Sequence, residues 1–158
     1  MLRSPLDMLT RLVTKPERLV CGIMSGTSVD AIDIAIARIH GSGTSTRIEL
    51  LQFNETLYAE EFQNRIFANS EVSSSNVNDI CLLHTALAHV YAAAVRESCQ
   101  SIGIEVEDLD LIGMHGQTLR HLPEPMEIAG YRIRSTLQIG SASTLSTLLR
   151  VPVVLFRN

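Results

Sequence analysis

The chain has 158 residues, of which 46% are hydrophobic and 19% charged, a size and composition that fit one globular domain with its own core. Thirteen Lys and Arg residues against seventeen Asp and Glu residues give a formal net charge of -4, so the sequence offers no basic surface for a nucleic acid. Mean hydropathy is only +0.18, and no apolar stretch reaches the length of a membrane span. We therefore expect a soluble cytoplasmic protein with no nucleic-acid partner and no membrane partner.

The N-terminal segment indicates where the folded unit begins, and the cysteines indicate its redox compartment. Basic residues near the N-terminus flank an apolar run that is too short and interrupted for a secretory signal. We interpret residues 1–16 as a flexible lead-in and residues 17–158 as the folded lobe. Cys21, Cys81 and Cys99 are widely spaced and set among apolar residues, a pattern that favours buried thiols in a reducing compartment and has no metal-ligand spacing.

Three short strands open the folded unit. Residues 18–25 form an apolar run that stops at a polar turn, and residues 31–39 and 47–53 alternate apolar and polar side chains. A Gly-Ser-Gly turn at residues 41–43 separates the last two runs. These features predict a three-stranded meander.

Two helices follow the meander. Residues 58–68 predict a short helix, and apolar residues at three- and four-residue spacing between Ile80 and Val95 predict a longer one. Asn76 supplies an N-cap for the longer helix, and Gly103 ends it.

The second half of the chain predicts strands, a loop and a further helix. We expect strands over residues 109–114, 136–140 and 151–156, and a helix over residues 141–150. The proline-containing stretch 121–130 is predicted to be a loop. A meander followed by alternating helices and strands indicates an α/β fold, with a mixed sheet and flanking helices of the ribonuclease H-like kind.

The last predicted strand raises the question of completeness. Residues 151–156 are strongly apolar, and only Arg157 and Asn158 follow them. Because both faces of a parallel sheet require cover, we interpret the chain as a piece of a longer protein. A C-terminal edge strand is the alternative.

A polar turn between the first two strands is the first candidate site. Residues 24–33 read Met-Ser-Gly-Thr-Ser-Val-Asp-Ala-Ile-Asp and combine a glycine, three hydroxyls and two carboxylates. Glycine permits close approach of the backbone to an anion, N–H groups and hydroxyls bind phosphate oxygens, and a carboxylate holds hydrated magnesium. The Gly-Lys-Ser or Gly-Lys-Thr of a Walker loop is absent. Alternatively, the turn is a hairpin whose polar side chains only satisfy its own N–H groups.

A second polar turn, His115-Gly116-Gln117-Thr118, ends the strand predicted at residues 109–114. Open α/β sheets place ligand groups at such strand ends. An imidazole, an amide and a hydroxyl suit sugar hydroxyls or a carboxylate. A histidine that caps the next turn is the alternative.

Three other polar residues have structural explanations. Ser141 follows Gln-Ile-Gly at residues 138–140 and opens a helix, so it is either part of an anion-binding helix start or an ordinary N-cap. His84 on the longer helix and His121 in the predicted loop are interpreted as surface or capping residues.

Three separated motifs occur in an order typical of one enzyme family. They are Gly-Ile-Met-Ser-Gly-Thr-Ser-Val-Asp at residues 22–30, Gly-Met-His-Gly-Gln-Thr at 113–118 and Thr-Leu-Gln-Ile-Gly at 136–140. Together they resemble the anhydro-N-acetylmuramic acid kinases over nearly the whole chain, from Leu19 to Arg157. The resemblance implies the N-terminal ATPase lobe of a member of the actin-like and sugar kinase superfamily, in which two ribonuclease H-like lobes close on ATP.

The resemblance implies a kinase that uses ATP and Mg²⁺. Such enzymes open the anhydro ring of 1,6-anhydro-N-acetylmuramic acid by hydrolysis and phosphorylate the freed 6-hydroxyl, which yields N-acetylmuramic acid 6-phosphate during cell-wall recycling. An aspartate activates the water, and catalysis otherwise depends on positioning and charge neutralisation. That aspartate belongs to a part of the family sequence beyond Asn158, so the resemblance places no catalytic residue in this chain and predicts no kinase activity for it alone. A homodimer or the missing C-terminal lobe would cover its exposed cleft.

Site residues carry over by position. The family's phosphate-binding segment corresponds to Gly26, Thr27, Ser28, Val29, Asp30, Ala31, Ile32 and Asp33. Asp30 is the carboxylate placed best near the metal, whose ligands stay undetermined. The turn that lines the sugar side supplies His115, Gln117 and Thr118.

The chain departs from the family pattern at three positions. Ala31 replaces a glycine that would permit a positive φ, Ser141 replaces an acidic residue, and Leu155 replaces the aspartate of Asp-Phe-Arg. These departures leave a second hypothesis open, a ligand-binding or interaction remnant of such a kinase without catalysis. A different sugar kinase of the same superfamily is the third.

Overall fold

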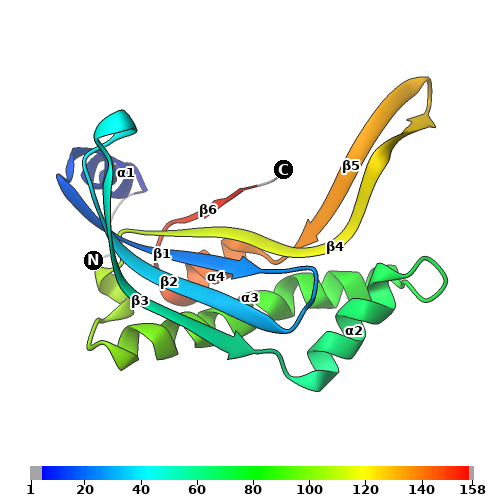
Figure 1. The fold of residues 1–158 in the computed structure, drawn as a ribbon, viewed down its shortest axis with the longest axis horizontal. Helices are drawn as coiled ribbons and strands as arrows, with labels where there is room; N and C mark the ends of the chain where they lie inside the picture. The colour runs from blue at the N-terminus through cyan, green and yellow to red at the C-terminus, as the bar shows by residue number, and fades with distance from the viewer. Residues whose placement is uncertain (1–4, 157–158) are drawn as a thin grey trace.

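One mixed sheet organises the chain in the computed structural model, which describes residues 5–156 (Figure 1). The strands are β1 (Glu17–Ser25), β2 (Ala31–His40), β3 (Arg47–Leu57), β4 (Leu111–Ile128), β5 (Tyr131–Ile139) and β6 (Val153–Leu155). The first three form the predicted antiparallel meander. Strand β4 pairs in parallel with β1 on one side and β6 on the other, and its distal part pairs antiparallel with β5. The strand order is β3-β2-β1-β4-β5.

One helix precedes the meander, and the other three occupy the places predicted after it. They are α1 (Pro5–Thr14), α2 (Glu60–Ser70), α3 (Val77–Ser101) and α4 (Ala142–Leu149), with short 3₁₀ turns η1 (Gly43–Ser45) and η2 (Val106–Asp108). Asn76 is the N-cap of α3, as predicted, because its side-chain oxygen accepts from the N–H groups of Asn78 and Asp79 at 2.9 and 3.3 Å. Within residues 5–156, no helix combines the length and apolar composition of a membrane-spanning helix.

Helix α1 occupies most of the segment predicted as a flexible lead-in. Pro5 opens this helix, where its missing N–H costs nothing. At the other end, the Arg18 guanidinium donates to the carbonyl oxygens of Leu12 and Val13 at 2.6 and 3.2 Å, and to that of Gly41 at 3.1 Å. These bonds satisfy the end of the helix and join it to the hairpin of β2 and β3.

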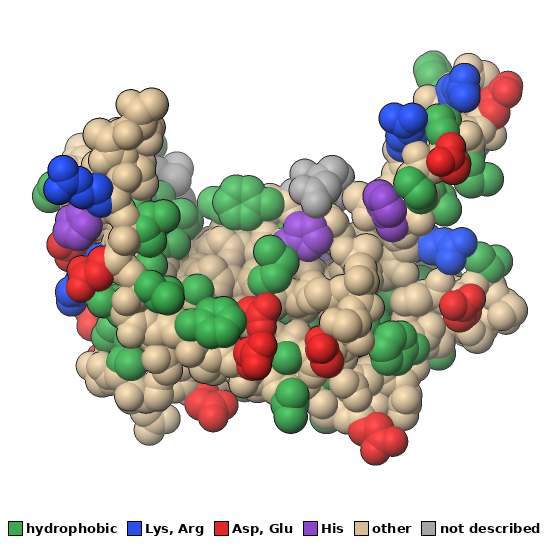
Figure 2. All heavy atoms as spheres, viewed as in Figure 1, with side chains coloured by type: hydrophobic (Ala, Val, Ile, Leu, Met, Phe, Trp, Pro, Cys, Tyr) green, Lys and Arg blue, Asp and Glu red, His purple; other side chains and the backbone are tan. Residues whose placement is uncertain are grey.

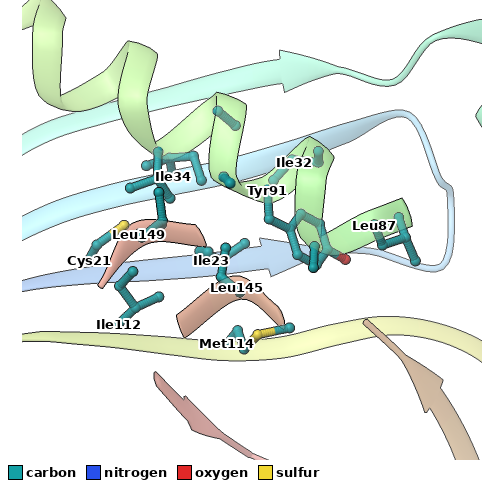
Figure 3. Packing of buried hydrophobic residues seen from close by; sticks show 14 of the residues in the cluster. Cys21, Ile23, Ile32, Ile34, Leu87, Tyr91, Ile112, Met114, Leu145 and Leu149 are labelled. Atoms are coloured by element: carbon teal, nitrogen blue, oxygen red, sulfur yellow. The ribbon is translucent and has the colours of Figure 1, made fainter. Parts of the chain in front are cut away.

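The hydrophobic core lies between the sheet and helices α3 and α4. Alternate residues of β2 point to this face, and Ile32, Ile34 and Ile36 are fully buried there. Figure 3 shows Ile32 beside Tyr91 of α3 and Ile34 further along β2, with Leu145 and Leu149 of α4 over β1 and β4. The alternate apolar residues of the strands therefore pack against the apolar face of α3, as the sequence predicts.

The opposite face of the central strands carries small residues. The register places Gly22 of β1 between Ala35 of β2 and Gly113 of β4. The Phe156 ring covers Gly113, with a ring carbon 3.1 Å from the place that a Cβ would take. Helices α3 and α4 leave this face open.

The stretch 121–130 is not a loop, and the prediction there was wrong. It forms the distal part of β4 and the turn into β5, and this hairpin, which we call the arm (residues 120–137), projects from the sheet (Figure 1). The register shifts between Leu122 and Met126, so the two intervening prolines lie in a bulge. Their lack of an N–H therefore removes no hydrogen bond between the strands. Ala129 and Gly130 then close the hairpin at φ values of 52° and 81°, as in a type I′ turn.

Two of the three cysteines are buried, and one is not. Burial raises the pKa of Cys21 to about 12 and that of Cys99 to about 11, so both thiols stay protonated. Cys81 lies exposed on α3, which corrects the expectation of three buried thiols. The helix turns this residue away from the apolar stripe on which its neighbours Ile80 and Leu83 lie.

We predict that iodoacetamide modifies Cys81 alone under native conditions, because only that thiol is exposed. Intact-mass measurement should give one adduct for the folded chain and three in guanidinium chloride, where all three thiols are accessible. The matched variant Cys81→Ser should give no native adduct. Native labelling of Cys21 or Cys99 at the rate of Cys81 would contradict the described packing.

Candidate functional site

The two predicted polar turns lie side by side at one end of the sheet. We call residues 26–30 the glycine turn and residues 115–118 the histidine turn. The second name is kept from the sequence, but the prediction that a turn ends the strand there was wrong, because residues 115–118 lie within β4, at a bulge against β1. Because β1 and β4 are parallel neighbours, the glycine turn that follows β1 lies beside the histidine turn, and Ser25 pairs with Gln117. The Gln117 side-chain nitrogen donates to the carbonyl oxygen of Gly26 at 3.0 Å. Figure 2 shows the surface hollowed between the two projecting hairpins, the arm and the hairpin of β2 and β3.

The glycine turn exposes four of its five residues and buries Val29. Gly26, Thr27 and Ser28 are exposed, whereas the Val29 side chain is only 1% exposed. Val29 has a φ of 55°, an uncommon conformation for a β-branched residue, and its N–H donates to the Gly26 carbonyl oxygen at 3.3 Å. The Gln63 side chain of α2 donates to the Val29 carbonyl oxygen at 2.8 Å. The turn is therefore anchored through Val29, and strained backbone of this kind concentrates at functional sites.

Asp30 closes the glycine turn as an exposed carboxylate. The Ser28 hydroxyl and the Ala31 N–H both donate to Oδ1, at 2.7 and 3.0 Å. The Ser28 bond is the main reason that the Asp30 pKa lies below its ordinary value, and backbone hydrogen bonds lower it further. Asp30 is therefore a stable anion at neutral pH.

The remaining residues of the predicted phosphate segment divide between the two faces of the sheet. Ile32 is a core residue, so only its backbone remains available. Ala31 and Asp33 alternate with it and lie on the open face, where Asp33 pairs with Met24 and Glu55. The left-handed residue of this segment is Val29 rather than Ala31. The alanine that departs from the family pattern thus fits its strand without strain.

The three predicted side chains of the histidine turn lie on opposite faces of the sheet. His115 and Thr118 lie toward the open face, and Gln138 of β5 pairs with Thr118. The Gln138 amide nitrogen lies 2.7 Å from His115 Nε2. Because an amide nitrogen only donates, His115 Nε2 accepts, and the proton of the neutral ring is assigned to Nδ1. Gln117 instead faces the helices and is fully buried.

A buried polar cluster beneath the turns was missed by sequence reasoning. The Tyr91 hydroxyl of α3 lies 3.0 Å from Ser25 Oγ, and the Tyr58 hydroxyl lies 3.4 Å from both Tyr91 Oη and Gln117 Oε1. Figure 3 shows Tyr91 reaching from α3 toward the end of β1. Burial raises the pKa of both tyrosines. The sequence signal was only that a tyrosine interrupts the apolar stripe of α3.

Two of the other three polar candidates are structural caps. His84 Nδ1 accepts from the Gly140 N–H at 3.1 Å. Ser141 Oγ accepts from the Thr144 N–H at 3.2 Å, which makes Ser141 the N-cap of α4. Of the alternatives that the sequence left open, the N-cap explains Ser141, and His84 is a capping residue. His121 lies exposed on the arm.

The glycine turn fits a magnesium–phosphate group in its donor chemistry. A Cβ at Gly26 would lie 3.3 Å from Ser28 Oγ, so the glycine keeps space open beside the hydroxyl. Mg²⁺ usually takes one or two protein carboxylates, with water and phosphate oxygens completing its shell, and ionised, exposed Asp30 suits that role. In the described part of the chain, no three His, Cys, Asp or Glu side chains converge as a complete metal site. Any metal here would depend on its phosphate ligand.

The fold and the two turns, together with the family match reported below, define a class of protein. The chain is a ribonuclease H-like α/β lobe with a mixed sheet and flanking helices, the N-terminal lobe of the actin-like and sugar kinase fold. Among solved structures, a CasPhi-2 (Cas12j) complex with crRNA and DNA aligns over 92% of the chain with a TM-score of 0.24, too low for an argument.

A family model described as anhydro-N-acetylmuramic acid kinase matches residues 18–158. A protein of that name from Caldanaerobacter subterraneus subsp. tengcongensis is 42% identical over 141 residues, which cover 89% of this chain and 36% of that protein. Its counterpart from Salinibacter ruber is 41% identical over 149 residues, or 94% of this chain and 38% of its own length. The chain belongs to the anhydro-N-acetylmuramic acid kinase family and spans little more than a third of these relatives.

We predict that Ser28→Ala raises the Asp30 pKa toward its ordinary value, because the Ser28 hydrogen bond is the largest cause of the lowering. A pKa lowered by folding stabilises the folded state above the ordinary carboxyl pKa, and this stabilisation is lost as the pH falls through the lowered value. Carboxyl-carbon NMR titration measures the shift. Ser42→Ala, in another exposed turn, is the control and should leave Asp30 unchanged; an unchanged Asp30 in Ser28→Ala would refute the assignment.

We also predict that Gly116→Ala destabilises the chain far more than Gly130→Ala. Both glycines have nearly the same left-handed φ, 80° and 81°, but a Cβ at Gly116 would lie 2.6 Å from the Ile139 carbonyl oxygen, whereas nothing lies within 4 Å at Gly130. The strain alone costs about 1 kcal/mol, and the clash should raise the loss at Gly116 to about 3 kcal/mol. Urea unfolding measures both losses, and equal values would disprove the close approach.

Proposed function

We propose that this lobe binds the phosphates of Mg-ATP at the glycine turn and an amino sugar at the histidine turn, as part of an anhydro-N-acetylmuramic acid kinase. The observation that supports the proposal most is the contact between the turns, where the Gln117 side chain bonds the Gly26 carbonyl oxygen. In the whole protein, we propose ATP-dependent conversion of 1,6-anhydro-N-acetylmuramic acid to N-acetylmuramic acid 6-phosphate, with hydrolytic opening of the ring. The proposed setting is cell-wall recycling in the cytoplasm.

On the nucleotide side, the residues of the phosphate-binding segment have different proposed roles. Thr27 and Ser28 offer exposed hydroxyls and N–H groups to phosphate oxygens. Asp30 is exposed, ionised and oriented by Ser28, which suits the metal that accompanies the phosphates. The buried side chains of Val29 and Ile32 hold the segment on the core. Bound Mg²⁺ would neutralise phosphate charge.

On the sugar side, the proposal assigns His115 and Thr118 as polar contacts. The Gln138 amide fixes the orientation of the His115 ring by donating to Nε2, and the Thr118 hydroxyl suits sugar hydroxyls. The family's catalytic aspartate corresponds to no residue of 1–158, so we propose that this polypeptide alone binds ligands without turnover. A second lobe or a second copy of the chain would complete the cleft.

We predict that Asp30→Asn weakens binding of Mg-ATP to the 158-residue chain by about tenfold or more, the effect of losing about 1.4 kcal/mol. Isothermal titration calorimetry measures the dissociation constant with magnesium and again with EDTA. Without metal, removal of a negative charge should leave binding of ATP unchanged or improve it, so the sign of the effect separates a metal role from a structural one.

Asp108→Asn is the matched control, because Asp108 lies before β4 at the end of that strand opposite the histidine turn. It should leave both titrations unchanged. Equal affinity of Asp30→Asn and the parent chain for Mg-ATP would remove Asp30 from the site. If the parent chain bound the amino sugar but no nucleotide, a ligand-binding remnant would replace the kinase proposal. Ser141 and Leu155, which depart from the family pattern, already favour that alternative.

A further inference from the structure

We infer that Ser25, Tyr58, Tyr91 and Gln117 form a buried clamp that fixes the glycine turn and the histidine turn relative to one another. Tyr91 and Gln117 are then positioning residues and not ligands. The use of the clamp, alignment of a phosphate with a sugar, rests on the proposed function, whereas the clamp itself rests on geometry alone.

The clamp draws on four separate parts of the chain. Ser25 ends β1, Tyr58 follows β3, Tyr91 lies in the middle of α3, and Gln117 lies on β4. All four side chains are buried, and Tyr91 and Gln117 are completely inaccessible. Buried polar groups are costly unless they are hydrogen-bonded, so each bond within the clamp restricts where these four elements can lie.

Gln117 uses its whole amide inside the protein. Its nitrogen donates to the carbonyl oxygens of Gly26 and Thr118 at 3.0 and 3.2 Å. Its oxygen, Oε1, accepts from the Tyr58 hydroxyl at 3.4 Å. A side-chain amide has two hydrogens, and both are committed to backbone of the two turns. The amide thus has no donor left for a substrate hydroxyl.

Tyr91 completes the second half of the clamp. The Ser25 hydroxyl donates to the Gly116 carbonyl oxygen at 3.2 Å. With the single hydrogen of Ser25 so placed, the Tyr91 hydroxyl donates to Ser25 Oγ across 3.0 Å. Burial raises the Tyr91 pKa, which keeps this hydrogen in place at neutral pH. Helix α3 therefore acts on the backbone of the histidine turn through Ser25.

Each bond from the clamp to a backbone carbonyl ends on one of the two turns. The accepting carbonyls are those of Gly26, Gly116 and Thr118, and the donors that reach them belong to β1 and β4. A shift of the glycine turn would break the Gln117 bond, and loss of that bond would free the histidine turn as well. The two turns are thus expected to loosen together.

Tyr91→Phe tests the clamp, because it removes one hydroxyl and keeps the ring in the core. We expect amide hydrogen exchange, followed by NMR, to accelerate about tenfold at Val29 and at residues 117–118 together, the effect of one buried hydrogen bond. Exchange at Ile34, in the centre of β2, provides the reference for global opening. Ser25→Ala should produce the same joint acceleration and is the second variant if Tyr91→Phe fails to fold.

Ser98→Ala is the matched control for Ser25→Ala. Ser98 is an equally buried serine that bonds Asn54 and Ala94 at the far end of α3. It should lower global stability without accelerating the two turns relative to Ile34. Acceleration of one turn only, of neither turn, or of both turns by Ser98→Ala would overturn the clamp.

A titration with Mg-ATP separates the clamp from the proposed function. In the parent chain, we expect Mg-ATP to shift amide signals of both turns. In Tyr91→Phe, the shifts at residues 26–28 should persist, and those at residues 115–118 should be lost. Retained shifts in both turns of the variant would overturn the clamp. Absence of binding to the parent chain would refute the proposed function, and hydrogen exchange alone would then decide the clamp.

Discussion

The candidate site depends on one constraint, the parallel register of β1 and β4 with its single irregularity after Ile23. Parallel pairing places the end of β1 beside the bulged part of β4, so the glycine turn and the histidine turn lie next to one another. The irregularity lies at Gly116, whose left-handed φ of 80° lets the chain pass close to the Ile139 carbonyl. In a regular strand Gln117 would share a face with His115. The bulge turns Gln117 inward and leaves His115 at the open face.

The bulge marks the place where the buried side chains change from apolar to polar. The apolar part stabilises the lobe, and the polar part fixes the geometry of the candidate site. Along most of the sheet the core is apolar, with isoleucines of β2 against α3 and with Met114 and Leu145 beside them (Figure 3). At the turn end this core gives way to the clamp of two tyrosines, a serine and a glutamine. Apolar contacts are non-directional and supply most of the free energy of folding. The directional hydrogen bonds then select one arrangement of the turns.

The sequence was informative wherever the structure is local or periodic, and less so where it depends on tertiary packing. Alternation predicted the meander, and the Asn76 cap predicted the start of α3. Prolines suggested a loop in the arm because the bulge that accommodates them appears only when β5 pairs with β4. The inward turn of Gln117 and the left-handed Val29 were equally invisible, since neither leaves a trace in composition. The motifs identified two segments that the structure brings together, but they did not predict the direction of each side chain.

The orientation of Gln117 changes how the histidine motif is interpreted. In sequence, its imidazole, amide and hydroxyl form one ligand-binding set, yet the structure assigns the amide to the glycine turn and leaves the imidazole and hydroxyl outside. Under the proposed function, the motif combines two groups that contact a ligand with a third that fixes their distance from the glycine turn. Under the proposed function, that distance separates a phosphate from a sugar. A single lobe would then set the alignment of the two ligands before any second lobe closes over them.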